Sequence, residues 1–182
     1  SGPVARWLGL AEREPQGALI IGAHAFARQL AALLGQQGLR AVLVDTNYHH
    51  VSESRLLGLE VYHGSALAEE TLDSIDLAGL GRVLALTGND EINVLSMIHF
   101  REVFGGSEVY RLPAADKRRP DGLHQGRTLF GSGVHYEMLD SVLDDGATLE
   151  ATQLNPSFTF ADFKARYGQQ AIPLCFVAES GR

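Results

Sequence analysis

The sequence predicts an α/β fold built on a doubly wound parallel sheet, and three observations support this prediction. Short apolar runs alternate with amphipathic stretches of helical period between Ala18 and Leu112. The first apolar run leads into a glycine turn at Gly22, and the second ends in an acid, Asp45. The connecting segments are short, which is typical of parallel strands joined by right-handed helical crossovers. We expect the strand order 3-2-1-4-5, with room for a sixth strand.

The predicted strands are apolar runs bounded by turn residues, as expected for strands covered on both faces. They span Ala18–Gly22, Ala41–Asp45, Leu59–His63, Arg82–Thr87 and Glu108–Leu112. In the segments between them, apolar residues recur every three or four positions, which indicates helices. The predicted helices span Ala25–Gln37, Asn47–Leu57, Leu67–Ile75 and Glu91–Phe104.

The composition changes after the fifth predicted strand. Residues 17–112 form the predicted sheet domain, and the charged, turn-rich residues 113–125 are expected to form a linker. Residues 126–182 are expected to form a small α+β segment. Its predicted helices are Tyr136–Leu143 and Phe158–Tyr167, and its predicted strands are Thr148–Leu154 and Ala171–Val177. The single cysteine, Cys175, is expected to be buried in the last of these strands.

Charge and composition exclude several classes of function. The net charge of −7, from 15 basic and 22 acidic residues, argues against nucleic acid as a partner. No apolar run approaches the roughly 18 to 20 residues that a membrane-spanning helix needs. One cysteine excludes an internal disulfide. We therefore expect a globular domain that binds a small molecule or another protein.

The turn after the first predicted strand has features of a nucleotide-binding site. Gly22 allows a sharp turn, the helix that follows offers N–H groups to a phosphate, and Asp45 is placed to accept ribose hydroxyls. The usual pattern is G-x-G-x-x-G, whereas His24 and Ala27 stand at its second and third glycines. An acid at this place disfavours a 2′-phosphate, so the expected cofactor is an adenine nucleotide, AMP or NAD/NADH, rather than NADP.

Ligands of open α/β sheets bind at the carboxyl ends of the strands, where the strand order reverses. The predicted nucleotide-binding residues are Gly22, Ala23, His24, Ala25, Asp45, Thr46, Ser65, Ala66, Thr87, Gly88 and Asn89. Two interpretations of His24 stay open: it donates to a phosphate, or it fills the space that a glycine would leave. Thr87 and Asn89 fit helix capping as well as ligand binding. Asn93 is expected on a helix surface or at an interface.

No residue pattern in the chain predicts a metal site or an active site. His49 and His50 are adjacent, so on a helix their rings point in different directions. The chain has no G-x-S-x-G, Walker lysine, H-E-x-x-H or C-x-x-C motif, and no catalytic base is identifiable. We therefore expect that the protein is not an enzyme and holds no metal.

The chain resembles the RCK N-terminal (KTN, TrkA-N) domain, a cytosolic regulatory module of potassium channels, potassium uptake systems and cation/proton antiporters. The resemblance rests on Leu19–Ala27 with Asp45, on Val61–Ala66, on Val109–Leu112 and above all on Leu86–Asn93. That last segment, Leu86-Thr87-Gly88-Asn89-Asp90-Glu91-Ile92-Asn93, is similar to the family's Thr-x-x-Asp-x-x-Asn turn. The resemblance implies a Rossmann-like fold that binds a nucleotide and forms homodimers, with the helix Glu91–Phe104 and the fifth strand as candidates for the interface.

The opening segment Ala5–Glu12, which contains Trp7, and the segment Asp45–Asn47 resemble the tails of NhaP-like sodium/proton antiporters. This resemblance implies that residues 1–16 are a linker from a transmembrane domain, and that the chain lies at the cytoplasmic face of the plasma membrane. The expected function is a regulatory domain that gates sodium or potassium transport through ligand-dependent rearrangement of a dimer. Two alternatives stay open: a dimerising scaffold that has lost its ligand, and a small NAD-dependent oxidoreductase.

Overall fold

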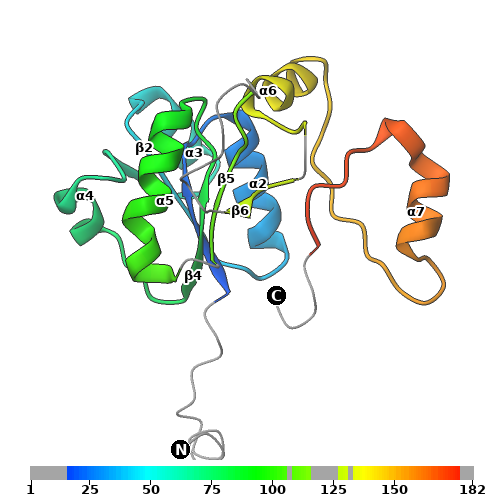
Figure 1. The fold of residues 1–182 in the computed structure, drawn as a ribbon, viewed down its shortest axis with the longest axis horizontal. Helices are drawn as coiled ribbons and strands as arrows, with labels where there is room; N and C mark the ends of the chain where they lie inside the picture. Colours follow the sequence, from blue (N-terminus) through cyan, green and yellow to red (C-terminus); the bar gives the residue numbers. More distant parts are fainter. Residues whose placement is uncertain (1–15, 106–107, 116–126, 131–132, 177–182) are drawn as a thin grey trace, which may run out of the picture.

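The computed structural model describes residues 16–105, 108–115, 127–130 and 133–176. Its centre is one sheet of six parallel strands in the order β3-β2-β1-β4-β5-β6, with helices on both faces (Figure 1). This arrangement confirms the predicted Rossmann-like α/β class, the order of the first five strands and the sixth strand. The strands are β1 (Gly17–Ile21), β2 (Ala41–Asp45), β3 (Glu60–His63), β4 (Leu80–Ala85), β5 (Val109–Arg111) and β6 (Arg127–Thr128).

The crossover helices follow the predicted pattern and differ from the expected bounds by one or two residues. They are α2 (Ala25–Gln36), α3 (Tyr48–Leu56), α4 (Glu69–Ser74) and α5 (Asp90–Phe104). Asparagine side chains cap two of them, because Asn47 accepts from the amide of His49 and Asn89 accepts from the amides of Glu91 and Ile92. The polar residues that follow two of the strands therefore fix where the next helices begin.

Alternate residues of the central strands face two separate hydrophobic cores. On one face Ile20 and Leu43 pack against Phe26 and Leu30 of α2. On the other face the core contains residues of β1, β2 and β4 together with α5: Leu19, Ile21, Val42, Val44, Val83, Met97 and Phe100. Both cores are almost completely shielded from solvent, so they hold the carboxyl ends of β1, β2 and β4 in fixed positions.

The segment after β6 is helical, with α6 (Tyr136–Asp144), α7 (Phe160–Tyr167) and the 3₁₀ turn η1 (Gly168–Gln170). The two strands predicted here are wrong for the described residues, because Thr148–Leu154 and residues 171–176 pair with no other strand. Cys175 is consequently exposed rather than buried in a strand. Neighbouring atoms still desolvate its thiol and raise the pKa of that thiol.

Two of the predicted segments lie mostly outside the described residues: the linker expected at 1–16, which includes Trp7, and the basic part of the linker at 113–125. Among the residues that the structure does describe, no helix is long and apolar enough to cross a bilayer.

Candidate functional site

The turn after β1 lies against the end of β2. Gly22 has a φ of +104°, a backbone conformation that side chains strongly disfavour, so glycine is required here. The amide of Gly22 donates to the carbonyl of Val44 at 2.8 Å, and the amide of Ala23 donates to Oδ2 of Asp45 at 2.7 Å. The predicted ribose-binding acid is thus tied directly to the predicted phosphate-binding turn.

Asp45 accepts three hydrogen bonds from described residues. Oδ2 accepts from the amide of Ala23 and lies 2.9 Å from Nδ1 of His50, while Oδ1 accepts from the amide of Asn47 at 2.8 Å. Partial burial alone would raise the pKa of this carboxyl group, but these bonds outweigh it, and the pKa is lower than usual. Asp45 is therefore ionised at neutral pH. A carboxylate has about four lone-pair positions, which leaves room on Oδ1 for a ligand hydroxyl.

His24 points back toward the sheet rather than out toward a ligand. Its Nε2 donates to the carbonyl of Leu86 at 2.7 Å, and the residue is only 7% exposed. Burial lowers the pKa of His24 from its ordinary value of 6.5, despite the opposing effect of this hydrogen bond. The neutral ring has one N–H, which Leu86 uses, so this geometry favours the space-filling interpretation over the phosphate donor.

The segment after β4 is held by hydrogen bonds within the chain. Oγ1 of Thr87 lies 2.8 Å from Oδ1 of Asn93 and 3.0 Å from the carbonyl oxygen of Asn89, so its single hydroxyl hydrogen is donated to one of these two acceptors. Asn93 also accepts from the amide of Thr87 and donates to its carbonyl. The surface position expected for Asn93 is wrong, because this side chain is 2% exposed and joins α5 to the end of β4. Asn89, and not Thr87, is the N-cap of α5.

Asp90, the middle residue of the same motif, pairs with a buried arginine on the next strand. Nη1 of Arg111 lies 3.1 Å from Oδ1 of Asp90, and the Arg111 side chain is only 6% exposed. Thr87, Asp90 and Asn93 therefore have structural roles, and together they fasten the start of α5 to β4 and β5.

Most of the remaining predicted residues lie around the end of β3 and the start of α2, and Thr46 directly follows β2. The amide of Gly64 donates to the carbonyl of Asp45, which places the third turn beside the second. The hydroxyl of Ser65 accepts from the amide of Leu67 at 3.2 Å, and Ala66 is buried in the core behind the turn. Ala25 and Thr46 are at least partly exposed.

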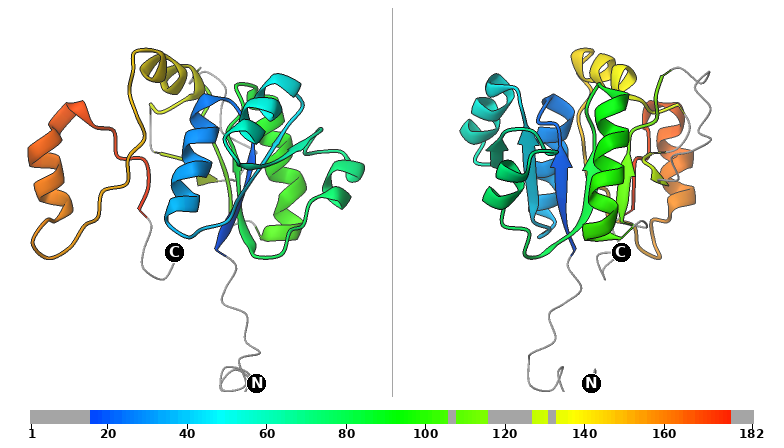
Figure 2. Two further views of the ribbon diagram at one scale, coloured as in Figure 1. Left: turned by 180° about the vertical axis from the view of Figure 1, so that it is seen from behind. Right: turned by 60° about the vertical axis from the view of Figure 1, so that its left-hand side comes forward.

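The structure adds two residues that the sequence did not predict at this site: His50, which lies beside Asp45, and Tyr136. Tyr136, the first residue of α6, makes an edge contact with the ring of His24, with 4.8 Å between centroids. It also covers Gly88 so closely that a Cβ there would lie 3.0 Å from the Tyr136 ring. In Figure 1 and Figure 2, α6 in yellow lies above the carboxyl ends of the strands, and its Leu139 packs in the same core as α2. No local sequence signal indicates this long-range contact.

A family model for the TrkA-N domain matches residues 18–120. The chain belongs to the TrkA-N domain family. The β1 turn, Asp45 and the Thr87–Asn93 motif all lie within the matched region of this TrkA-N domain.

Several solved structures resemble the chain at low sequence identity. The NAD(P)-binding domain of an exopolyphosphatase-related protein from Archaeoglobus fulgidus is 18% identical, with a TM-score of 0.53 over 74% of this chain and 96% of that one. The TrkA-N domain of the inner membrane protein YbaL from Escherichia coli is 17% identical, with a TM-score of 0.55 over 72% and 97%. An NAD-bound GsuK channel is 19% identical, with a TM-score of 0.46 over 60% and 21%. No curated protein sequence matches the chain.

The two adjacent histidines of this TrkA-N domain contact different carboxylates. His50 binds Asp45, whereas Nε2 of His49 lies 3.5 Å from Glu53. Within the described residues, no cluster of three or more histidine, cysteine or acidic side chains has the geometry of a metal site.

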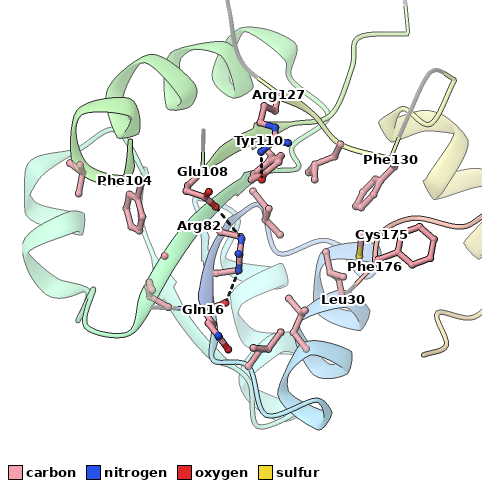
Figure 3. A pocket seen from close by; sticks show the side chains of 18 residues that line it. Gln16, Leu30, Arg82, Phe104, Glu108, Tyr110, Arg127, Phe130, Cys175 and Phe176 are labelled. Carbon is pink, nitrogen blue, oxygen red and sulfur yellow. Dashed lines mark hydrogen bonds and ion pairs between the residues drawn. The ribbon is translucent and has the colours of Figure 1, made fainter. Parts of the chain in front are cut away.

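A pocket of about 790 Å³ lies at the other end of the sheet, near the amino ends of β1, β4 and β5 (Figure 3). Leu30, Leu84 and Phe176 contribute apolar walls. At its edge, Arg82 pairs with Glu108 at 3.1 Å. Because ligands of doubly wound sheets bind at the carboxyl ends, the residues around Asp45, rather than this pocket, are the candidate nucleotide site.

Proposed function

We propose that this TrkA-N domain binds an adenine nucleotide and thereby regulates a monovalent cation/proton antiporter. The observation that carries the proposal is the hydrogen bond between the side chain of Asp45 and the turn after β1. The ionised carboxylate holds the Ala23 amide in the turn that leads to α2, whose first N–H groups would face a phosphate, and it keeps an acceptor position for a ribose hydroxyl. The proposed ligands are AMP and NAD/NADH.

The names of the structural neighbours agree with this proposal. One neighbour is described as an NAD(P)-binding domain and another as part of an inner membrane protein. The proposed location is therefore the cytoplasmic face of the membrane, where the chain would act as a regulatory domain attached to a transport protein. Catalysis is not part of the proposal.

Nucleotide binding is tested by thermal unfolding of the wild-type chain with AMP, ADP, ATP, NAD, NADH and NADP. At about 100 times its dissociation constant, a ligand adds roughly 2.7 kcal/mol of stability. For a chain of this length, this corresponds to a shift in Tm of about 5–10 °C. We expect this shift with AMP or NAD and a smaller one with NADP, because Asp45 repels a 2′-phosphate.

The variant Asp45→Ala should lose the ligand-induced shift. The same substitution at Asp73, an exposed acid on α4, is the matched control and should keep the full shift. Because Asp45→Ala also removes the bond to the Ala23 amide, the relevant quantity is the difference in Tm with and without nucleotide. A wild-type protein whose Tm does not respond to millimolar nucleotide would contradict the proposal.

We further propose that regulation operates through a homodimer that uses α5. Leu95 and Ile98 are about half exposed and lie three residues apart, so they occupy one outer face of this helix. The opposite face of α5, which includes Met97 and Phe100, packs on the sheet. A nucleotide can bias an attached transporter only if it binds two arrangements of such a dimer with different affinities.

The dimer is tested by sedimentation equilibrium. Leu95→Lys with Ile98→Lys should weaken self-association at least about 100-fold, because two charges would be buried against the partner. Leu56→Lys with Leu57→Lys is the matched control, since these leucines are exposed at the end of α3, and it should leave association unchanged. A wild-type chain that stays monomeric at high concentration would contradict the proposal.

One alternative function has a specific observation in its favour. His24 and Tyr136 fill part of the candidate site, which is what a dimerising scaffold without a ligand would show. The nucleotide experiment separates the two functions, because a scaffold predicts dimerisation with no change in Tm at any nucleotide concentration.

A further inference from the structure

The candidate site at the carboxyl ends of the strands has two unequal halves. A sheet of this order consists of two mononucleotide-binding halves, and a dinucleotide lies across both of them. The half formed by β1, β2 and β3 ends in Gly22, Asp45 and Gly64. The half formed by β4, β5 and β6 lies on the other side of the β1–β4 boundary and ends near Gly88 and Leu112.

His24 crosses the boundary between the halves. Its backbone belongs to the start of α2, which follows β1, and its Nε2 is bonded to Leu86, which follows β4. A Cβ at Gly22 would lie 3.3 Å from the His24 ring and 3.5 Å from Cγ2 of Thr87. The ring and the threonine therefore occupy the space above the glycine turn, where a pyrophosphate would pass from one half to the other.

Tyr136 closes the second half. Its ring packs on Gly88 and on the edge of the His24 ring. Burial of Leu139 against the α2 side of the sheet anchors the helix that carries Tyr136. The first half is not covered in this way: Thr46 is exposed, and Oδ1 of Asp45 retains an acceptor position.

We infer that the site takes one adenine mononucleotide, and that His24 and Tyr136 are specificity-determining residues that exclude the second nucleoside of a dinucleotide. This inference rests on the proposed nucleotide-binding function and narrows its ligand class. AMP is the adenosine half of NAD, so both ligands make the same contacts with Asp45. Their difference in affinity therefore reports only on the second half of the candidate site.

The test is isothermal titration of AMP and of NAD into the full wild-type chain. AMP should bind at least about tenfold more tightly than NAD. In the double variant His24→Gly with Tyr136→Ala, the preference should fall to about threefold or less, through tighter binding of NAD with little change for AMP. Tyr167→Ala, which removes the same ring from α7, is the matched control and should keep the wild-type preference.

The wild-type measurement decides the inference even if the double variant fails to fold. NAD binding as tightly as AMP would overturn this inference and leave the proposed function in place. Binding of neither ligand would overturn both. An unchanged preference in a folded double variant would show that His24 and Tyr136 do not set the ligand class.

Discussion

Replacing Gly17 with alanine is expected to destabilise the protein by about 3 kcal/mol or more. Gly17 starts β1 and lies between two backbone carbonyls. A Cβ there would lie 2.7 Å from the oxygen of Gly79 and 2.8 Å from the oxygen of Arg40. Both neighbours are main-chain atoms that belong to hydrogen bonds with β1, so neither can move without breaking its bond. Urea-induced unfolding of the variant measures the loss.

The same substitution at Gly35 provides the control. Gly35 lies near the end of α2, and a Cβ there would meet no atom within 4 Å. Alanine is the better helix former, so Gly35→Ala should leave the free energy of unfolding unchanged or raise it by up to about 1 kcal/mol. Equal effects of the two substitutions would show that the contacts at Gly17 do not limit stability.

Asp90→Ala is expected to cost about 2–4 kcal/mol of unfolding free energy, because it removes the carboxylate that lies 3.1 Å from the buried charge of Arg111. Pairing Asp90→Ala with Arg111→Met removes that charge, so the double variant should be more stable than Asp90→Ala alone. Denaturant titration of both variants measures this difference.

Glu91→Ala is the control for the helix terminus. Glu91 is exposed and lies in the same first turn of α5, so both acids interact favourably with the helix dipole. The interaction with the helix dipole accounts for less than about 1 kcal/mol of the cost of Glu91→Ala. If Asp90→Ala cost less than about 1 kcal/mol, the helix dipole alone would account for the loss, and the pair with Arg111 would have no structural role.

The sheet could be predicted because its signals are local. The central strands β1 and β2 are apolar runs, and Asn47 and Asn89 mark helix starts through their own side chains. The incorrect prediction of a strand at Thr148–Leu154 shows that local signals alone are not sufficient. Its alternating pattern fits a strand, but a strand also needs a neighbour with which to pair, and no described strand lies beside it.

The candidate site was only partly predictable for a related reason. Asp45 and Gly22 belong to a spacing pattern that the sequence displays. The contact of Tyr136 with His24 joins residues more than 100 positions apart and follows from packing of α6 on α2. Asn93 was misplaced because an asparagine within a helix is usually on the surface, whereas this one faces inward to bind Thr87.

Because the first turn of α5 is fixed to β4 and β5, a rotation of this helix at its first turn would produce a larger displacement at its far end. Thr87, Asp90 and Asn93 hold its first turn, and the 11 residues after Asn93 extend for roughly 16 Å beyond that attachment. A tilt of about ten degrees at the fastened end would move the far end by about 3 Å, on the same geometry. Small displacements beside the candidate site would thus be enlarged toward the outer end of α5, along the face that carries Leu95 and Ile98.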